Sequence, residues 1–427
     1  MGNPVVDWLP ALTPRRLRQL WYAPLLALAM GLMMVRLLVM ARLLDVPAFG
    51  EFSGGMLVSA TFCMVGALGL QAMLQREWPV RIVQGRERRA LVLATQAMVV
   101  AGACAGLAAL CAAALPWSGM SASLLVSGVM HGLSQQVFLL STIDSRSRGD
   151  SVGYAAQNLS RAGLALVLSV VAASLSRSPT VILWVDAIAT LALAWRFFGR
   201  SVARAFSRLH ALVIIAIRGL PRVPWRSALV LMTIGVVGFV QLNLDRWVAA
   251  DRLGVSGFAQ YSFAWVVLSL AQSAQAVINA SVYPAVARRF AGHGGRTAFS
   301  ACFRVSVALL ALGAGVATML DPLLHLAIDH WYPQYADAHA LIPTFLAIGV
   351  LRVSDFWSSF LLVTGQERQL LLVNLAALIL ALGAWTALHL PSTTPVDALR
   401  SVGWLAALIT ATNYAAVAAS AWWVRQR

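Results

Sequence analysis

The sequence predicts an all-α membrane protein of about twelve transmembrane helices, arranged as two related halves of six helices each. Three observations support this fold class. Hydrophobic residues make up 60% of the 427 residues and charged residues only 11%, against about 25% in soluble domains. Apolar stretches of about 20 residues or more recur along the chain, and each is long enough to cross the hydrocarbon layer as a helix. A segment that begins at residue 42 recurs at residue 251, which indicates an internal repeat.

Apolar windows between charged breaks place the spans in order along the chain. The first half holds spans over 21–40, 50–74, 90–115, 120–143, 154–175 and 179–198. The second half holds spans over 226–244, 257–283, 298–320, 338–364, 368–390 and 401–424. Because the first span contains Arg36 and follows a basic lead, we expect a retained span and not a cleaved signal peptide.

The net charge of +16 comes from arginine alone, since the sequence contains no lysine. The arginines cluster in short segments between spans, where membrane orientation explains them, so no nucleic-acid partner is expected. One side of the predicted membrane collects most of them, which places both termini in the cytoplasm and requires an even number of spans. The cytoplasmic set comprises Arg15, Arg16, Arg18, Arg76, Arg81, Arg86, Arg88, Arg89, Arg146, Arg148, the run from Arg196 to Arg226, Arg288, Arg289, Arg296, Arg368, Arg425 and Arg427.

The longest cytoplasmic connection lies in the middle of the chain and divides it into a first bundle (1–199), a linker (200–225) and a second bundle (226–427). In the linker, Arg200, Arg204 and Arg208 recur at four-residue spacing before the apolar stretch 211–217. This pattern is typical of an amphipathic helix that lies on anionic headgroups.

The internal repeat aligns residues 42–53 with residues 251–262 without a gap. Four aligned positions are identical, and Phe52 stands opposite Tyr261. Both segments follow the first span of their half, and six spans separate them, so the two halves have the same orientation. A pseudo-two-fold axis along the membrane normal follows, which is typical of secondary transporters.

Charged side chains inside spans are costly unless they face a partner or a wet cavity, so the few present here are candidate site residues. Guanidinium groups keep their charge and present a planar fork to phosphate oxygens, which favours a diphosphate-bearing anion as the substrate. An exporter of organic cations would instead gather carboxylates. The predicted substrate-binding arginines are Arg36, Arg161, Arg304 and Arg352.

Other roles are open for these side chains. Arg36 and Arg304 lie near predicted span ends, from which they could reach the headgroups. Arg352 could pair with Asp355, three residues further on the same helical face. Asp186 is either a proton or cation site or the partner of an arginine on a neighbouring span, and Asp355 is the second candidate for energy coupling.

Amide side chains also recur inside the spans, where bonding between helices is the alternative to a role in transport. Gln272, Gln275 and Asn279 share one face of the eighth span, so they are predicted to line a hydrated path that suits sugar hydroxyls. Asn158 is a further predicted lining residue. The four cysteines and the Asp- and His-rich segment 321–339 lack metal-ligand spacing, and no phosphate loop or nucleophile elbow is present, so no cofactor, metal or enzymatic activity is expected.

Two stretches carry a resemblance to a known family. Residues 41–45 and 49–52 look like its first outer loop and the start of its second span, although Asp45 replaces the usual glycine. Asp245-Arg246, Leu253-Gly254, Tyr261 and Tyr283-Pro284 look like its seventh and eighth spans. On these residues the chain resembles the polysaccharide-transport (Wzx-type, O-antigen flippase-like) family of the multidrug, oligosaccharidyl-lipid and polysaccharide (MOP) flippase superfamily.

The resemblance implies a MATE-like, V-shaped pair of six-helix bundles around a cationic cavity that opens alternately to each side. It implies a flippase for undecaprenyl-diphosphate-linked oligosaccharide in the bacterial inner membrane, with polysaccharide polymerase and chain-length proteins as partners. A cation-coupled multidrug exporter of the same fold and a membrane polysaccharide polymerase or ligase are the alternatives. The short outer loops, of which 321–338 is the longest, argue against the enzyme.

Overall fold

The protein is built almost entirely of helices. The computed structural model describes residues 21–114, 119–206, 209–388 and 394–426. Within these ranges, twelve helical segments are long and apolar enough to cross a membrane, and each of the twelve predicted spans overlaps one of them. The predicted fold class, an all-α protein with twelve transmembrane helices, is confirmed.

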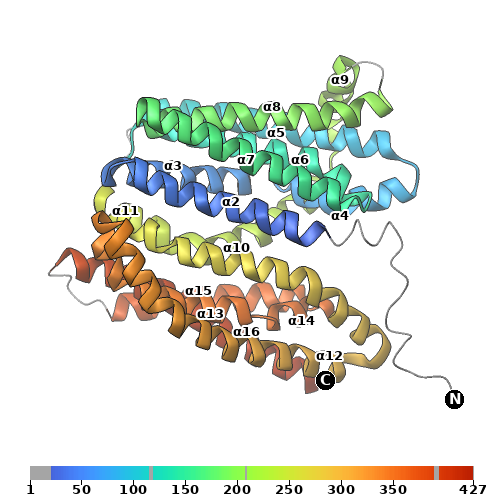
Figure 1. Cartoon of the computed structure of the whole chain (residues 1–427). Helices are drawn as coiled ribbons and strands as arrows, with labels where there is room; N and C mark the ends of the chain where they lie inside the picture. The colour runs from blue at the N-terminus through green and yellow to red at the C-terminus, as the bar shows by residue number, and fades with distance from the viewer. Residues whose placement is uncertain (1–20, 115–118, 207–208, 389–393, 427) are drawn as a thin grey trace.

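Figure 1 shows the helices in two groups, one above the other. The first group contains α2 (Tyr22–Leu43), α3 (Val46–Val65), α4 (Leu70–Val83), α5 (Glu87–Ala114), α6 (Ala122–Ser147), α7 (Ser151–Ser176), α8 (Pro179–Ala205), α9 (Leu209–Gly219) and η2 (Leu220–Arg222). The second contains α10 (Trp225–Arg252), α11 (Gly254–Ala264), α12 (Val266–Trp331), η3 (Pro333–Ala340), α13 (Ile342–Ser354), α14 (Trp357–Val363), α15 (Glu367–Ala387) and α16 (Pro395–Gln426). The long α12 covers two predicted spans and is broken at Gly294, where φ is 77°.

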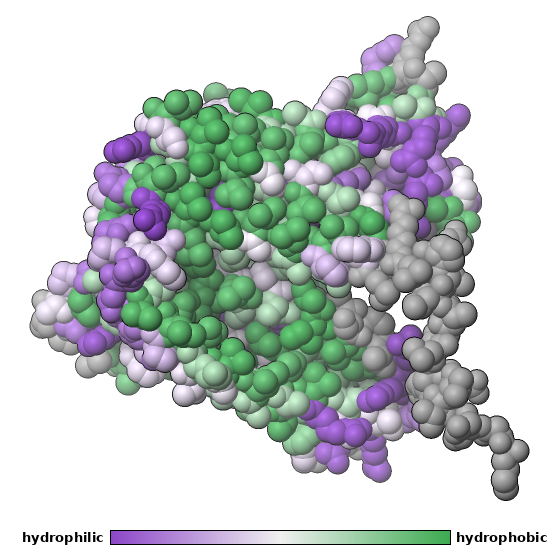
Figure 2. Space-filling model, in the orientation of Figure 1, coloured by the Kyte–Doolittle hydropathy of each residue, from purple (hydrophilic) through white to green (hydrophobic). Residues whose placement is uncertain are grey.

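The outer surface is apolar over most of the length of the helices. Large side chains such as Leu312, Met319 and Ile379 are 64–72% exposed. In Figure 2, hydrophobic side chains cover the middle of the visible face and hydrophilic ones gather toward its two ends. A soluble protein would not present so large an apolar surface to water, so this surface is the one that contacts lipid.

Helix α3 packs against α11 at one end of the molecule, which we call the closed end, and α10 also contacts α3 and α4 of the first group. A β-carbon added to Gly50 of α3 would lie 2.3 Å from the backbone oxygen of Val255 in α11, so the two helices are in close contact. The Tyr335 hydroxyl of η3 donates to the backbone oxygen of Ala41 over 3.1 Å. Burial raises the pKa of the Tyr335 phenol, so this hydroxyl stays protonated and remains a donor.

The two repeat segments form corresponding corners at the closed end, but the backbone conformation at the corner differs between them. Gly254, the first residue of α11, adopts φ of 64°, a conformation that glycine reaches at low cost. Asp45, its aligned partner, keeps φ at −68° and caps α3, because its carboxylate accepts the backbone N–H of Ala48 over 3.0 Å. An N-cap carboxylate in one half thus replaces the glycine of the other half.

At the opposite end, which we call the arginine-rich end, ion pairs connect neighbouring helices of the first group. Asp144 of α6 binds Arg148 over 2.8 Å and Arg204 of α8 over 2.7 Å. Arg148 also reaches Glu87 of α5 over 3.0 Å, and this hydrogen bond raises the pKa of the Arg148 guanidinium. These bonds hold together the ends of α5, α6 and α8.

The prediction of a separate amphipathic helix that carries Arg200 and Arg204 is wrong. Helix α8 continues to Ala205, so both arginines belong to the end of the sixth span. The short α9 that follows packs against α5, where Gln96 donates to the backbone oxygen of Ala216 over 3.2 Å. Some residues of the predicted arginine pattern lie outside the described ranges: Arg15, Arg16, Arg18, Arg208 and Arg427.

Candidate functional site

A crevice lies between the two groups of helices and reaches from the arginine-rich end toward the middle of the protein. It consists of two adjoining cavities of about 470 Å³ and 200 Å³ that share Leu26 and Met30 of α2. Helices α2 and α7 form one wall, and α12 and α14 form the other. Since the groups touch at the closed end, the described part of this crevice is closed there and extends toward the arginine-rich end.

Arg161 lines the inner cavity of the crevice. It lies ten residues inside α7, about 15 Å from the start of that helix at the usual rise per residue. Its guanidinium lies over the ring of Phe138 at 5.1 Å, while its Nε has no hydrogen-bond partner. Among the described residues Arg161 makes no ion pair, so its charge is available to a ligand.

Arg146 lines the outer cavity, together with Tyr22, Tyr154 and Tyr283. Asn279 of α12 lines the same cavity and accepts a hydrogen bond from Ser359 of α14 over 3.2 Å. Asn158 lines the inner cavity and donates to the backbone oxygen of Tyr154. The described lining of both cavities includes no carboxylate, so the crevice is cationic as well as polar.

A buried charged cluster lies inside the first group, and we call it the first cluster. Arg36 of α2 pairs with Asp186 of α8, with Nη1 and Oδ2 2.8 Å apart. His131 of α6 contacts the same carboxylate oxygen through Nε2 at 2.8 Å, and its Nδ1 meets the Ser59 hydroxyl of α3 at 2.7 Å. Arg36, His131 and Asp186 are at most 1% exposed. The ion pair that the sequence left open for Asp186 is therefore present, and the charge of Arg36 is already compensated.

Close contact between α3 and α6 brings Ser59 to His131. Gly128 and Gly132 of α6 are four residues apart, and a β-carbon on either would lie within 2.8 Å of a backbone oxygen of α3. This spacing of small residues lets two helices approach closely in a membrane. Ser59 of α3 and Arg36 of α2 then fix the His131–Asp186 pair of α6 and α8 in place.

The second group contains a corresponding buried cluster, the second cluster. The Tyr261 hydroxyl of α11 donates to Asp245 of α10 over 2.6 Å. Arg246 lies 4.2 Å from the centre of the Trp265 ring, and Arg352 of α13 interacts electrostatically with Asp245. The repeat alignment, continued in the same register, pairs Arg36 with Asp245 and Phe52 with Tyr261. Arg36 lies over the Phe52 ring at 5.6 Å, so equivalent positions make a cation–aromatic contact in one half and a hydrogen bond in the other.

Arg352, Gln275 and Asp355 line a small cavity of about 90 Å³ inside the second group, apart from the crevice. The alternative that Arg352 pairs with Asp355 on one helical face is not realised in the described structure. Helix α13 ends at Ser354, and Asp355 accepts hydrogen bonds from the backbone and hydroxyl of Ser358 over 3.3 and 2.8 Å. The carboxylate therefore caps the next helix, α14, and the described structure gives it no ion pair.

The predicted site residues thus separate into several environments. Arg161, Asn158 and Asn279 line the crevice, whereas Gln275 and Arg352 face the small cavity. Gln272 has a buried side-chain nitrogen without a partner. Arg304 is exposed on α12 and donates only to the backbone oxygen of Ser300 over 3.3 Å in the described part of the chain.

Sequence reasoning missed four functional candidates: His131, Ser59, Asp245 and Arg146. A lone histidine inside the fourth span was a usable signal, since polar groups at that depth need partners. Asp245 and Arg146 lie at or beyond the predicted span ends, where charges are ordinary. Only the packing of α6, α7 and α12 shows that Arg146 borders the crevice.

Comparisons with known proteins show the fold. No family model matches the sequence, and no curated protein is similar enough in sequence to match. The lipid II flippase MurJ in an inward closed conformation superposes with a TM-score of 0.62 at 10% identity, covering 94% of this chain and 87% of that chain. An outward-facing multidrug resistance MATE transporter of the MOP superfamily gives 0.56 at 15% identity, covering 95% and 96%. A MOP superfamily transporter from Pyrococcus furiosus, described as having a binding pocket of reversed polarity, gives 0.53 at 16%, covering 95% and 96%.

Proposed function

We propose that this chain, which has the fold of the MOP-superfamily transporters, is a flippase that moves undecaprenyl-diphosphate-linked oligosaccharides across the bacterial inner membrane. In this proposal the arginine-rich end and both termini face the cytoplasm, in agreement with the distribution of arginines in the sequence. The conformation described is then open toward the cytoplasm through the crevice and closed where α3 meets α11.

The observation that carries the proposal is the unpaired Arg161 in the crevice. Asp186 acts on Arg161 electrostatically without forming an ion pair with it. An arginine without an ion pair at this depth is costly in a membrane, and the cost is offset when an anion binds. A diphosphate supplies two or more charged oxygens for the guanidinium forks of Arg161 and Arg146. The amide and hydroxyl groups of Asn158, Asn279 and Ser359 suit the hydroxyls of a sugar.

Transport follows from rocking of the two groups relative to each other. Opening of the α3–α11 contact, with closure of α2 against α12, would expose Arg161 to the other side of the membrane. The apolar wall formed by Leu26, Met30 and Met33 gives the polyprenyl chain a surface beside the crevice. No covalent chemistry is required.

The two rival functions are less well supported by the same lining. A cation-coupled multidrug exporter needs carboxylates in the cavity, whereas Asp186 is held by Arg36 and His131 and Asp355 caps α14. A polysaccharide polymerase or ligase needs a catalytic group outside the membrane, and the solved structures that superpose on the chain are of transporters.

The test is complementation of a strain that lacks this protein, with surface polysaccharide and the leaflet of the lipid-linked precursor as readouts. We expect Arg161→Ala, produced at normal levels, to trap precursor in the inner leaflet. Loss of one charge-assisted contact should slow transport about 10- to 100-fold. The control is Arg304→Ala, which removes an exposed arginine from outside the crevice and should leave transport unchanged. Precursor that reaches the outer leaflet in the absence of the protein would contradict the proposal and favour the enzyme.

A further inference from the structure

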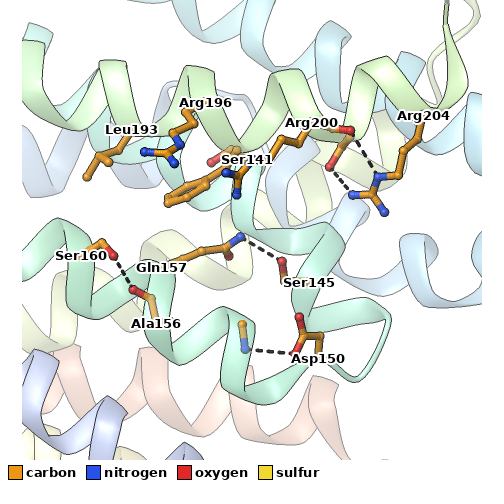
Figure 3. A pocket seen from close by; sticks show the side chains of 13 residues that line it. Ser141, Ser145, Asp150, Ala156, Gln157, Ser160, Leu193, Arg196, Arg200 and Arg204 are labelled. Atoms are coloured by element: carbon orange, nitrogen blue, oxygen red, sulfur yellow. Dashed lines mark hydrogen bonds between the residues drawn. The ribbon is translucent and has the colours of Figure 1, made fainter.

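A second polar cavity lies inside the first group, away from the crevice, between α6, α7 and α8 at the arginine-rich end (Figure 3). Its volume is about 470 Å³, within the range of small-molecule sites. Figure 3 shows Arg196 and Arg200 projecting from α8 toward α7, with Gln157 and Ser145 opposite them. We call this cavity the arginine pocket.

Three arginines form one stripe along its α8 wall. Arg196, Arg200 and Arg204 are four residues apart, so they lie on one face of the helix and span about 12 Å along its axis. Helix α8 ends at Ala205, which places Arg196 about 14 Å from that end. The stripe therefore covers the depth at which a helix passes from hydrocarbon into the headgroup layer.

The charges of the stripe are only partly compensated. Arg204 is fixed by Asp144 and donates to the Ser201 hydroxyl over 3.2 Å. Asp150, the acidic residue of the lining, caps α7 by accepting the backbone N–H of Gly153 over 3.0 Å. Neither Arg196 nor Arg200 makes an ion pair with any residue that the structure describes, and both are exposed. Two guanidinium groups thus remain to bind an anion.

The opposite wall offers hydroxyl and amide groups. Ser141 and Ser145 come from α6, and Ser160 comes from α7. Gln157 donates to the Ser145 hydroxyl over 3.0 Å, while its own carbonyl oxygen is buried without a partner. A buried acceptor of this kind is stabilised when a ligand supplies a hydroxyl donor.

We propose that the arginine pocket binds the headgroup of an anionic glycerophospholipid from the leaflet at the arginine-rich end. Arg196 and Arg200 bind the phosphate, and the glycerol hydroxyl of a phosphatidylglycerol headgroup donates to Gln157. The depth of the stripe favours a lipid as the source of the phosphate, because a free anion would have to enter the headgroup layer. This inference concerns a site other than the crevice and does not depend on the proposed substrate.

The test measures lipid binding to the purified full chain by native mass spectrometry and by thermal unfolding. The probes are phosphatidylglycerol, phosphatidic acid, phosphatidylcholine and inorganic phosphate. We expect the Arg196→Gln/Arg200→Gln variant to bind phosphatidylglycerol at least about tenfold more weakly than the wild-type protein. The matched control is Arg288→Gln/Arg289→Gln, which removes two exposed arginines from α12 and should retain wild-type binding.

Two further variants distinguish the parts of the site. Arg196→Lys/Arg200→Lys keeps the charge but loses the planar forks, so it should bind more weakly than the wild-type protein and more tightly than the glutamine variant. Gln157→Leu should weaken the binding of phosphatidylglycerol several-fold and leave that of phosphatidic acid, which lacks the glycerol hydroxyls, nearly unchanged.

Several outcomes would overturn the inference. Equal phosphatidylglycerol binding by the glutamine variant and its control would exclude the arginine pocket. Equal binding of phosphatidylcholine would show that acyl chains, not the anionic headgroup, are recognised. If inorganic phosphate raised the thermal unfolding temperature as much as phosphatidylglycerol does, the pocket would be assigned to a free anion. Loss of flipping without any change in phospholipid binding would assign it to the diphosphate of the cargo.

Discussion

The first cluster should behave as a structural ion pair, and substitution of Asp186 tests this directly. Asp186→Asn keeps the shape of the side chain but removes the charge that compensates Arg36, 2.8 Å away at 1% exposure. Removal of one partner from a buried pair leaves the other charge uncompensated and costs about 3–5 kcal/mol. We therefore expect the free energy of unfolding to fall by about that amount in Asp186→Asn and, for the same reason, in Arg36→Met.

The double variant Arg36→Met/Asp186→Asn distinguishes an ion pair from a simple packing defect. The introduced methionine would lie beside Phe52 and Met56, which already contact the arginine. The introduced asparagine keeps one oxygen acceptor and gains an amide donor, so it can still form hydrogen bonds with His131 and Thr190. Because both charges are gone, we expect the double variant to lie within about 2 kcal/mol of the wild-type protein, well short of the sum of the single losses.

The assay is equilibrium unfolding by sodium dodecyl sulfate in mixed micelles, followed by tryptophan fluorescence. Arg161→Met is the control, because the same substitution there removes an arginine that Asp186 attracts electrostatically but that makes no ion pair in the described structure. Its unfolding free energy should change by less than about 1 kcal/mol, although transport is slowed. Wild-type stability of Asp186→Asn, or a double variant as unstable as the sum of its parts, would refute the reasoning.

Two other predictions concern the contacts between the groups. Gly69→Ala should cost about 2–5 kcal/mol in unfolding free energy, because residue 69 has φ of 80° and the new β-carbon would lie 1.9 Å from the backbone oxygen of Ala228. Gly85→Ala, also at positive φ but with no atom within 4 Å, should cost only about 1–2 kcal/mol, and equal losses would contradict the steric explanation. Tyr335→Phe removes the hydrogen bond to Ala41 at the closed end and should cost about 0.5–1.5 kcal/mol in the same assay, whereas Tyr332→Phe should be nearly neutral. Equal effects of the two tyrosine substitutions would show that this bond does not stabilise the closed end.

The spans could be predicted from the sequence because the length of an apolar run is a local property. In a bilayer, the backbone N–H and C=O groups of each such run must form hydrogen bonds with one another. A single run of this length can do so only as a helix. The internal repeat could also be detected in the sequence, because it is a local similarity between two segments. Residues 42–53 and 251–262 form equivalent corners in the structure. The end of α8 was predicted too early because Arg196, Arg200 and Arg204 interrupt the apolar pattern without interrupting the helix.

The partners of the buried charges could not be predicted in the same way. Asp186 meets Arg36 and His131 only because α2, α6 and α8 pack together, and no local pattern specifies that packing. The helix break at Asp355 was not predicted because neither glycine nor proline marks it. Helix α13 ends there because the Asp355 carboxylate accepts hydrogen bonds from Ser358 at the start of the next helix. Arg161 could be selected from its depth alone, but its lack of a partner is a property of the folded structure.

The most direct test of the account is flipping by the purified protein in liposomes. Wild-type protein, Arg161→Ala and Arg304→Ala would each be reconstituted with a fluorescent polyprenyl-diphosphate-linked oligosaccharide, and access of the sugar to an external glycosidase would be measured over time. The account predicts rapid flipping by the wild-type protein and Arg304→Ala, and flipping about 10- to 100-fold slower in Arg161→Ala. Equal rates for Arg161→Ala and wild-type protein would contradict the central claim that an unpaired arginine in the crevice binds the diphosphate.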